Sequence, residues 1–261
     1  MRKAICLLLV FCLLLTACCA LKPAPDLFPL FADYEGCFVV WDVAADETIR
    51  FNPGRCAERL SPCSTYKIPH SLIALETGVI PDQDYVIKWD GTQYPVESWN
   101  RDHTMASAVQ NSVVWYFQAV ATEVGTERMQ EYVDRFGYGN QDISGGLTQF
   151  WLGSSLKISA EEQIDFLHRL DTGDLPVSAR SMDIVKGVLV QEETDAYVYR
   201  GKTGSCTPEG EQPLGWFVGT LNRDGTTIIF ATNIQGAGAD GQRARSITED
   251  VLKSLDLLQQ P

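Results

Sequence analysis

Apolar and polar residues alternate in several short stretches near the two ends of the chain, and this period of two predicts β-strands. The first predicted strand covers residues 37–43, and residues 49–51 form its hairpin partner after a polar turn. The other predicted strands cover residues 197–202, 215–221 and 226–233. The polar run Asn222-Arg-Asp-Gly225 between the last two is typical of a hairpin turn.

In the middle of the chain the apolar positions recur every three or four residues, which is the spacing of a buried helix face. The predicted helices cover residues 64–77, 104–124, 128–136, 159–170, 178–190 and 243–257. Gly78, Gly125 and Gly137 mark helix ends, and Ser159 and Glu162 have the spacing of a capping box.

Strands at both ends with helices between them indicate an α+β fold, in which the two termini complete one antiparallel sheet flanked by helices. We expect a single domain over residues 31–261, with a helical subdomain inserted at about 82–174. The cleft between the sheet and this subdomain is the expected site.

The N-terminal segment has the pattern of an export signal. Arg2 and Lys3 precede the apolar residues 4–15, a run that is too short for a stable membrane span. The run ends in Leu15-Thr-Ala-Cys18, which is similar to a bacterial lipobox. We therefore expect a signal peptide over residues 1–17 and a lipid on Cys18.

A tether over residues 18–30 would follow the lipid. The alternative is an ordinary signal peptide cut after Ala17 or Ala20, with Cys18 incidental. Both interpretations place the protein outside the cytoplasm, either in the periplasm or attached to a membrane as a lipoprotein. The lipid is then the expected membrane contact.

The formal net charge of −13 repels phosphate backbones, so we expect no nucleic-acid partner. Neither the three histidines nor the cysteines have the spacing of a metal site, which argues against a metal-dependent hydrolase. Beyond the leader, four cysteines remain: Cys37, Cys56, Cys63 and Cys206. They can pair in three ways that the sequence does not separate, or remain as buried small side chains.

The first candidate for chemistry is Ser64-Thr-Tyr-Lys67, an S-x-x-K pattern at the start of a predicted helix. Residues three apart share a helix face, so the amine can meet the hydroxyl and activate it as a nucleophile. A helix start also directs N–H groups at charge that develops on an attacked carbonyl. The apolar residues that follow predict a buried lysine that loses its charge easily. Taken alone, the pattern equally fits a helix cap with a solvated lysine.

The same pattern recurs at Ser154–Lys157 in a Gly-Ser loop, and we interpret this copy as chance. Lys202-Thr-Gly204 is more informative because it lies on a predicted strand. There Lys202 and Thr203 could bind a substrate carboxylate, and Gly204 could let substrate approach the backbone. S-x-x-K followed by K-T-G is the pattern of penicillin-recognising serine enzymes.

Further stretches make the resemblance specific. The S-D-N element of class A enzymes is replaced by Ser112-Val-Val114, and no E-x-x-L-N segment follows. The sequence resembles the class D (OXA-type) serine β-lactamases over nearly the whole mature chain. The matching stretches, in the family's order, are residues 62–69, 99–102, 112–114, 138–140, 150–152, 202–204 and 215–219.

The resemblance implies that Ser64 forms an acyl-enzyme with a small-molecule β-lactam. It implies that Lys67 reacts with CO₂ to give a carbamate (N6-carboxylysine), which is the general base, and that no other cofactor takes part. Trp151 would donate its indole N–H to the carbamate. Ser112, assisted by Lys202, would pass a proton to the leaving nitrogen.

The same resemblance implies a binding site in which Val114 keeps the pocket dry and the backbone N–H groups of Ser64 and Ser205 form an oxyanion hole. The family often has an arginine near the start of the last helix that pairs with the substrate carboxylate. Arg243 and Arg245 lie in that stretch, but neither has the expected spacing to Ile247, so both stay candidates.

Three further features are interpreted from their place in the matching stretches. Tyr138-Gly-Asn140 is expected to support the shape of the site. Trp99 and Leu152 fit either a pocket lining or a core role. Cys63 and Cys206 flank the two main motifs directly.

Two other hypotheses use the same motifs: a penicillin-binding transpeptidase or carboxypeptidase, and a β-lactam sensor domain. Trp151 and the S-x-V element argue against the first. Sensors of this kind follow several transmembrane helices, and we expect none here because no second long apolar run exists. The substrate spectrum and the oligomeric state stay open.

Overall fold

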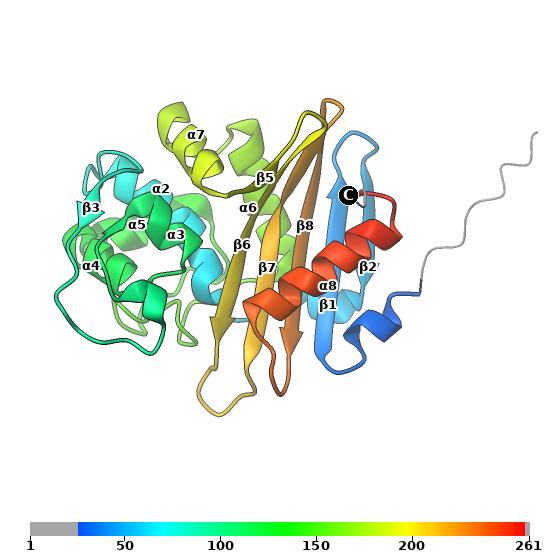
Figure 1. The fold of residues 1–261 in the computed structure, drawn as a ribbon, viewed down its shortest axis with the longest axis horizontal. Coiled ribbons are helices and arrows are strands. Elements are labelled where there is room, and N and C mark those ends of the chain that lie inside the picture. The colour runs from blue at the N-terminus through cyan, green and yellow to red at the C-terminus, as the bar shows by residue number, and fades with distance from the viewer. Residues whose placement is uncertain (1–25, 259–261) are drawn as a thin grey trace, which may run out of the picture.

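Six antiparallel strands in the order β2-β1-β8-β7-β6-β5 form the centre of the structure (Figure 1). They are β1 (Glu35–Asp42), β2 (Glu47–Phe51), β5 (Val190–Glu193), β6 (Tyr197–Cys206), β7 (Leu214–Arg223) and β8 (Thr226–Gln235). Because β1 pairs with β8, strands from the two ends of the chain join in one sheet. The predicted α+β fold is thereby confirmed.

The computed structural model describes residues 26–258. The predicted signal peptide over residues 1–17 and the predicted lipid site at Cys18 lie outside the described residues. Among residues 26–258, no helix is both long enough and apolar enough to span a membrane.

Helices cover both faces of the sheet. They are α1 (Pro53–Ala57), α2 (Lys67–Glu76), α3 (Met105–Gln110), α4 (Val114–Val124), α5 (Thr126–Phe136), α6 (Ala160–Thr172), α7 (Ala179–Val188) and α8 (Gly241–Ser254). Short 3₁₀ turns occur at η1 (Phe28–Phe31), η2 (Cys63–Tyr66) and η3 (Glu97–Trp99), and β3 (Val86–Ile87) pairs with β4 (His103–Thr104).

The sheet separates two apolar cores. On one face α8 and η1 pack over a core that includes Phe217, Phe230 and Val251, and α8 crosses the strands in Figure 1. On the other face α6 lies against β1, β7 and β8, although its residues fall within the predicted helical subdomain. The larger core continues from there into α2, which packs against α4, α5 and α7.

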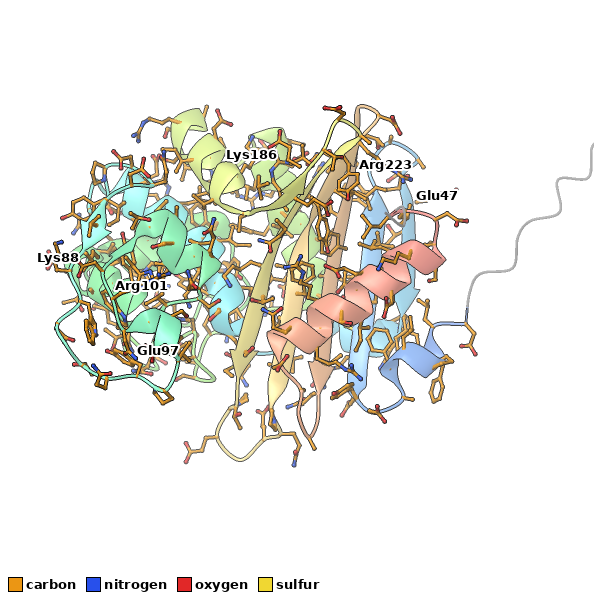
Figure 2. The ribbon with its side chains drawn as sticks, viewed as in Figure 1. Glu47, Lys88, Glu97, Arg101, Lys186 and Arg223 are labelled. Atoms are coloured by element: carbon orange, nitrogen blue, oxygen red, sulfur yellow. A yellow bond between two sulfur atoms is a disulfide. The ribbon has the colours of Figure 1, made fainter. Side chains whose placement is uncertain are left out.

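The surface outside these cores is charged. The side chains of Glu47, Lys88, Glu97 and Arg101, which Figure 2 labels, are exposed. This distribution leaves few charges inside, and those that are buried therefore need a specific explanation.

Several element predictions need correction. Within the predicted tether over residues 18–30, Leu27 is apolar and buried in the core beneath α8, so the packed part of the chain begins before residue 31. β5 was not predicted, since its Val-Gln-Glu-Glu sequence has one apolar residue and it forms the exposed edge of the sheet. The β7–β8 turn agrees with its sequence: Asp224 and Gly225 have φ of 50° and 74°, as a two-residue hairpin turn requires.

The predicted helix over residues 104–124 is two helices, α3 and α4. Ser112 has a φ of 53°, and its N–H donates to the Val109 carbonyl oxygen at 3.2 Å. The Val113 N–H donates to the Ala108 carbonyl oxygen at 2.9 Å. These two bonds form a Schellman cap, with a serine where glycine is usual. The apolar periodicity runs through this break, so the sequence pattern did not reveal it.

Candidate active site

Ser64 lies in η2, the 3₁₀ turn that leads directly into α2. The Lys67 Nζ donates a hydrogen bond to the Ser64 Oγ at 2.8 Å, because side chains three residues apart eclipse one another in such a turn. The predicted meeting of hydroxyl and amine is confirmed. The α-helix, however, begins at Lys67 and not at Ser64.

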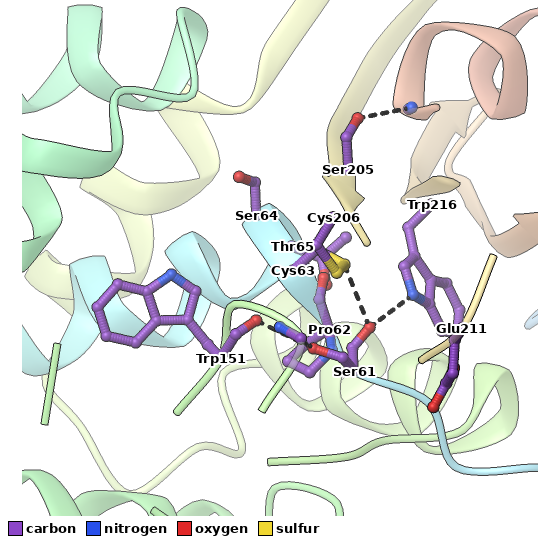
Figure 3. The surroundings of a disulfide bond; sticks show 12 residues. Ser61, Pro62, Cys63, Ser64, Thr65, Trp151, Ser205, Cys206, Glu211 and Trp216 are labelled. Atoms are coloured by element: carbon purple, nitrogen blue, oxygen red, sulfur yellow. Dashed lines mark hydrogen bonds between the residues drawn. A yellow bond between two sulfur atoms is a disulfide. The ribbon is translucent and has the colours of Figure 1, made fainter. Parts of the chain in front are cut away.

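The segment before Ser64 is held by hydrogen bonds from three directions (Figure 3). The Trp216 Nε1 on β7 donates to the Ser61 carbonyl oxygen at 2.9 Å. The Ser61 Oγ donates to the Trp151 carbonyl oxygen at 3.1 Å, and the Gly153 N–H donates to that same Oγ at 2.9 Å. Ser61 thus connects the nucleophile turn to the loop that carries Trp151.

A disulfide between Cys63 and Cys206 adds a covalent link from this turn to β6, with Cα atoms 5.6 Å apart (Figure 3). Of the pairings that the sequence left open, the structure contains this one. Cys37 and Cys56 are free and buried. The disulfide joins residues directly beside Ser64 and Ser205, so it connects two walls of the site.

Lys202 projects from β6 toward the helices. Its Nζ hydrogen-bonds to the Ser112 Oγ and to the Thr203 carbonyl oxygen, the latter at 2.8 Å. The left-handed backbone of Ser112 places its hydroxyl at this point, between α3 and α4. The K-T-G lysine and the S-x-V serine, which lie 90 residues apart in the chain, therefore meet as the sequence comparison implied.

Successive residues of β6 face opposite sides of the sheet. Ser205 Oγ accepts a hydrogen bond from the Gly241 N–H at 2.8 Å, at the start of α8 (Figure 3). Gly204 faces the other way, where a Cβ atom would lie 3.0 Å from the Pro62 carbonyl oxygen and 3.1 Å from Thr65 Cγ2. The absence of a side chain at Gly204 therefore lets β6 pack closely on η2.

The site-facing half of β6 is open along one edge. β5 pairs with Val198, Tyr199 and Arg200 at the start of the strand. In the described structure its ladder stops there, so the K-T-G segment has β7 on one side and the cleft on the other. An extended substrate group can therefore reach backbone groups of this edge.

Lys67 is fully buried, and burial, together with the nearby charge of Lys202, holds the pKa of its amine well below the ordinary value. The amine lies 5.4 Å from the centre of the Phe117 ring. Trp151 is also fully buried, and its Nε1 has no hydrogen-bond partner within the described residues. Burial lowers the pKa of Lys202 to about 7, so this second lysine is partly neutral at physiological pH.

A cleft of about 550 Å³ gives access to Ser64. Its lining comes from η2, η3, the ends of α3 and α4, β6 and the start of α8. The lining residues are Ser64, Val96, Ser98, Trp99, Gln110, Asn111, Ser112, Val114, Thr203, Ser205 and Gln242. Serine hydroxyls, a buried amine at 2.8 Å and an adjoining lysine make this a site for acyl transfer.

Comparison with known proteins identifies the family. The family model described as penicillin binding protein transpeptidase domain matches residues 37–253. The probable β-lactamase YbxI of Bacillus subtilis is 42% identical over 228 residues, which are 87% of this chain and 84% of that protein. The solved class D β-lactamase BAT-2 has a TM-score of 0.85 at 44% identity, over 90% of this chain and 98% of the other.

The chain belongs to the class D β-lactamases. It is therefore a hydrolase that acts on β-lactams, within the broader transpeptidase family. The C-terminal domain of the Bacillus licheniformis BlaR penicillin-receptor has the same fold, with a TM-score of 0.86 at 33% identity over 90% of this chain and 96% of that domain.

The two candidate arginines of this β-lactamase lie differently. Arg243 turns away from the cleft, with its guanidinium carbon 5.9 Å from the centre of the Tyr34 ring. Arg245 lines a second cavity of about 100 Å³ together with Lys202 and Thr203. Its guanidinium donates to Glu249 at 2.7 Å and to Gln191 at 2.8 Å.

The remaining predicted residues support the walls of the cleft. Asn140 accepts a hydrogen bond from the Lys157 N–H at 2.8 Å and donates to the Ser155 carbonyl oxygen at 2.9 Å, which braces the loop after Trp151. Trp99 lines the cleft and donates to the Asn111 carbonyl oxygen at 2.9 Å. Leu152 packs against the larger core.

Sequence reasoning missed two kinds of site residue. Gln242 lines both cavities from the first turn of α8. In the sequence it directly precedes Arg243, and the two arginines were the candidates in this stretch. Phe117 and His70 surround Lys67, but in the sequence they are ordinary members of apolar helix faces. For His70, the signal was a histidine three residues after the lysine on a helix that is otherwise apolar.

Proposed function

We propose that this class D β-lactamase works through an acyl-enzyme on Ser64, with the Lys67 side chain as general base in its carbamate form. The observation that supports this proposal best is the 2.8 Å contact between the Ser64 Oγ and the Lys67 Nζ, in a place where the lysine has no exposed surface. A charged ammonium is strongly disfavoured there, so the amine is largely neutral and nucleophilic toward CO₂.

The residues around Lys67 fit a carbamate. Its formation joins the Nζ to the carbon of CO₂ and releases one proton to solvent. The buried Trp151 Nε1 has no acceptor among the described residues, and an unpaired buried donor is costly. A carbamate on Lys67 supplies an anionic oxygen that can take a proton from Ser64. Phe117 and Trp151 exclude bulk water from this point.

The chain's own groups then account for ring opening. The Ser64 Oγ forms a bond to the β-lactam carbonyl carbon, and the bond from that carbon to the ring nitrogen breaks. The Ser112 hydroxyl gives its proton to the ring nitrogen and takes one in turn from the charged Lys202. Lys202 regains a proton from solvent, to which the base releases the proton that it took from Ser64. Backbone N–H groups of Ser64 and Ser205 stabilise the oxyanion. Water then cleaves the ester and restores the Ser64 hydroxyl.

Substrate binding uses the open edge of β6. Thr203, Ser205 and Val114 line the cleft beside Ser64. Lys202 and Thr203 also border the smaller cavity that Arg245 reaches, whereas Arg243 faces Tyr34. We therefore assign the substrate carboxylate to the Lys202, Thr203 and Arg245 side of the cleft.

A steady-state β-lactam hydrolysis assay of the soluble form, with and without bicarbonate, tests the proposal. CO₂-depleted enzyme should lose most of its turnover, and bicarbonate should restore it. Activity that is indifferent to both treatments would contradict the carbamate. A burst without turnover would instead favour a penicillin-binding transpeptidase. A stable acyl-protein would favour a sensor like the penicillin receptor.

We also propose that the chain is exported and carries a lipid on Cys18. The support is the sequence alone: Arg2 and Lys3, the apolar run and the Leu-Thr-Ala-Cys junction. Mass spectrometry of the mature N-terminus should find a lipid-modified cysteine at residue 18. An unmodified start at Leu21 would contradict the lipid.

A further inference from the structure

Unpaired polar atoms gather around Lys67. Among the described residues, five buried side-chain N or O atoms have no hydrogen-bond partner. Three of the five are the Trp151 Nε1 and both ring nitrogens of His70. An unsatisfied buried donor or acceptor is costly and rare, so three such atoms in one place indicate a missing partner.

His70 lies on α2, one turn after Lys67. Side chains on a helix lean toward its N-terminus, which carries the His70 ring over the turn that holds the lysine. The ring centre lies 5.2 Å from that of Trp151 and 5.1 Å from that of Phe117. Since Phe117 also faces the Lys67 amine, both orphaned rings border the lysine pocket.

Other groups in the pocket do not satisfy these rings. The Tyr66 hydroxyl, from a ring 5.4 Å away from that of His70, donates to the Met129 Sδ at 3.2 Å. The indole of Trp151 can only donate. One His70 nitrogen and the Trp151 Nε1 therefore each carry an N–H that lacks an acceptor, and the second His70 nitrogen lacks a donor.

The electrostatic state of His70 suits an anion on Lys67. Complete burial, with a smaller contribution from Lys67, lowers the pKa of His70 to about 3. The ring is neutral at physiological pH, so one nitrogen carries a hydrogen and donates. Such a neutral ring can donate one hydrogen bond to a carbamate oxygen on Lys67.

We propose that His70 is a positioning residue for the base at Lys67, and that its ring N–H and the Trp151 indole N–H together hydrogen-bond the Lys67 carbamate. This inference rests on the proposed function, because it needs the carbamate to form. It goes further by assigning a second donor from this chain, on the same helix as the lysine.

The test measures carbamate formation directly. The full-length enzyme and its variants are titrated with [¹³C]bicarbonate at fixed pH, and the ¹³C carbamate signal on lysine gives the bicarbonate concentration for half-occupancy. His70→Leu should raise that concentration about 10- to 100-fold, which is the usual effect of losing a hydrogen bond to a charged group. His70→Phe, which keeps a ring of similar size, should behave as His70→Leu does and carries the test if the leucine variant does not fold.

Two conservative variants separate hydrogen bonding from packing. The amide nitrogen of His70→Asn lies near the position of Nδ1, and that of His70→Gln near Nε2. One of them should keep half-occupancy within about threefold of the wild type, which also identifies the donating nitrogen. Phe166→Leu removes a buried ring outside the pocket, so it controls for a general loss of stability.

Two results would overturn the inference. One is that folded His70→Leu or His70→Phe reaches half-occupancy at the same bicarbonate concentration as the wild type, because the ring would then act only by packing. The other is loss of the signal in folded Asn and Gln variants alike. If the wild-type enzyme itself shows no carbamate signal and no bicarbonate dependence, the proposed base fails together with this inference.

Discussion

The chain contains the S-x-x-K pattern twice, and the two copies differ in nearly every physical respect. At Ser64 the hydroxyl and the Lys67 amine are in contact at 2.8 Å and the lysine is fully buried. At Ser154 the hydroxyl hydrogen-bonds to the Gly145 carbonyl oxygen at 3.5 Å. Lys157 reaches out to Glu211 at 3.8 Å, with 36% of its side chain exposed.

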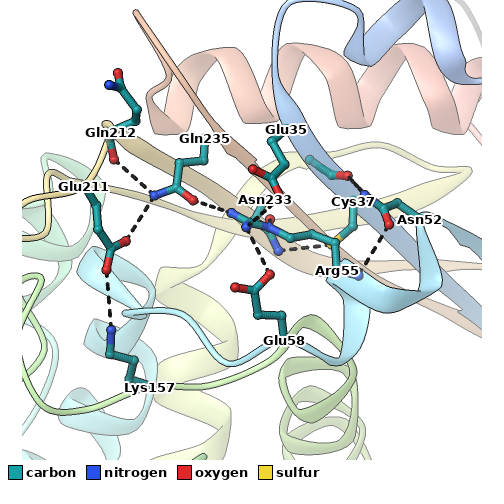
Figure 4. A network of polar contacts seen from close by, with 11 residues as sticks. Glu35, Cys37, Asn52, Arg55, Glu58, Lys157, Glu211, Gln212, Asn233 and Gln235 are labelled. Atoms are coloured by element: carbon teal, nitrogen blue, oxygen red, sulfur yellow. Dashed lines mark hydrogen bonds and ion pairs between the residues drawn. The ribbon is translucent and has the colours of Figure 1, made fainter.

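The surrounding structure explains this difference. The first copy forms a turn and the start of a helix, and both pack against aromatic side chains. No solvent reaches the Lys67 amine there to stabilise a positive charge. The second belongs to a loop that is tied down by Asn140, and its lysine extends toward a network of polar residues at the edge of the sheet (Figure 4). In that network Glu211 also accepts from Gln235, and Gln235 accepts from Arg55 at 2.7 Å.

The four-residue pattern therefore does not determine reactivity. Contact between the two side chains needs a helical turn, and a depressed lysine pKa needs desolvation. At the first copy the turn is present and Lys67 is buried, whereas Ser154 lies in a loop and the Lys157 side chain is 36% exposed. Four experiments test this comparison.

Replacing the two lysines should give opposite results. Lys67→Ala removes the base, and we expect kcat/KM for a β-lactam to fall about 10⁴-fold or more, as for loss of a catalytic group in other serine enzymes. Lys157→Ala should stay within about twofold, since its exposed ion pair contributes little. Steady-state kinetics on the two purified variants measure both values. A large loss in Lys157→Ala would mean that the second copy takes part in the reaction.

The disulfide is next to the first copy of the pattern, because Cys63 directly precedes Ser64. Changing Cys63 and Cys206 together to Ala should lower the free energy of unfolding by about 4 kcal/mol, because the bond closes a loop of 143 residues in the unfolded chain. Denaturant unfolding measures this. Cys37→Ala, which removes a free buried thiol, should cost about 1 kcal/mol and serves as the control. Equal losses would show that the disulfide adds nothing beyond its packing.

The pH profile tests the lysine that assists the first copy. Lys202 is charged below its pKa of about 7 and neutral above it. If the charged form binds the substrate carboxylate, kcat/KM should fall as the pH rises through 7, about tenfold per pH unit. Profiles at saturating bicarbonate, between about pH 6 and 9, measure this limb. The Lys202→Met variant should lack it, and a flat wild-type profile would contradict the assignment.

The loop of the second copy supports Trp151 instead of doing chemistry. Asn140→Ala removes hydrogen bonds of 2.8 and 2.9 Å to that loop, and we expect a loss of about 1–3 kcal/mol in unfolding free energy. Because the loop follows Trp151, the bicarbonate requirement should rise modestly as well. Chemical denaturation and the bicarbonate titration measure the two effects. If Asn140→Ala loses stability while its bicarbonate requirement stays unchanged, the loop does not influence the site at Lys67.

Local sequence patterns predicted most regular elements. Alternation predicted β1, β6, β7 and β8, and the Ser159–Glu162 capping box is present at the start of α6 with both of its hydrogen bonds. The patterns failed where structure is not periodic. The break at Ser112 is a capping geometry without a glycine, and β5 is too polar and short to resemble a strand.

By itself the sequence determined the antiparallel sheet closed by both termini, the family, and the pair Ser64 and Lys67, because helix and strand periodicities and contiguous motifs are local properties. The tertiary structure confirmed the predicted burial of Lys67, and it alone decided that Cys63 pairs with Cys206 and that Arg243 packs beside Tyr34. It also brought the rings of His70 and Trp151 together, with their centres 5.2 Å apart and their nitrogens unpaired among the described residues. Disulfide pairing, the direction of a long side chain and unpaired hydrogen bonds arise from contacts between distant segments, so no local pattern encodes them.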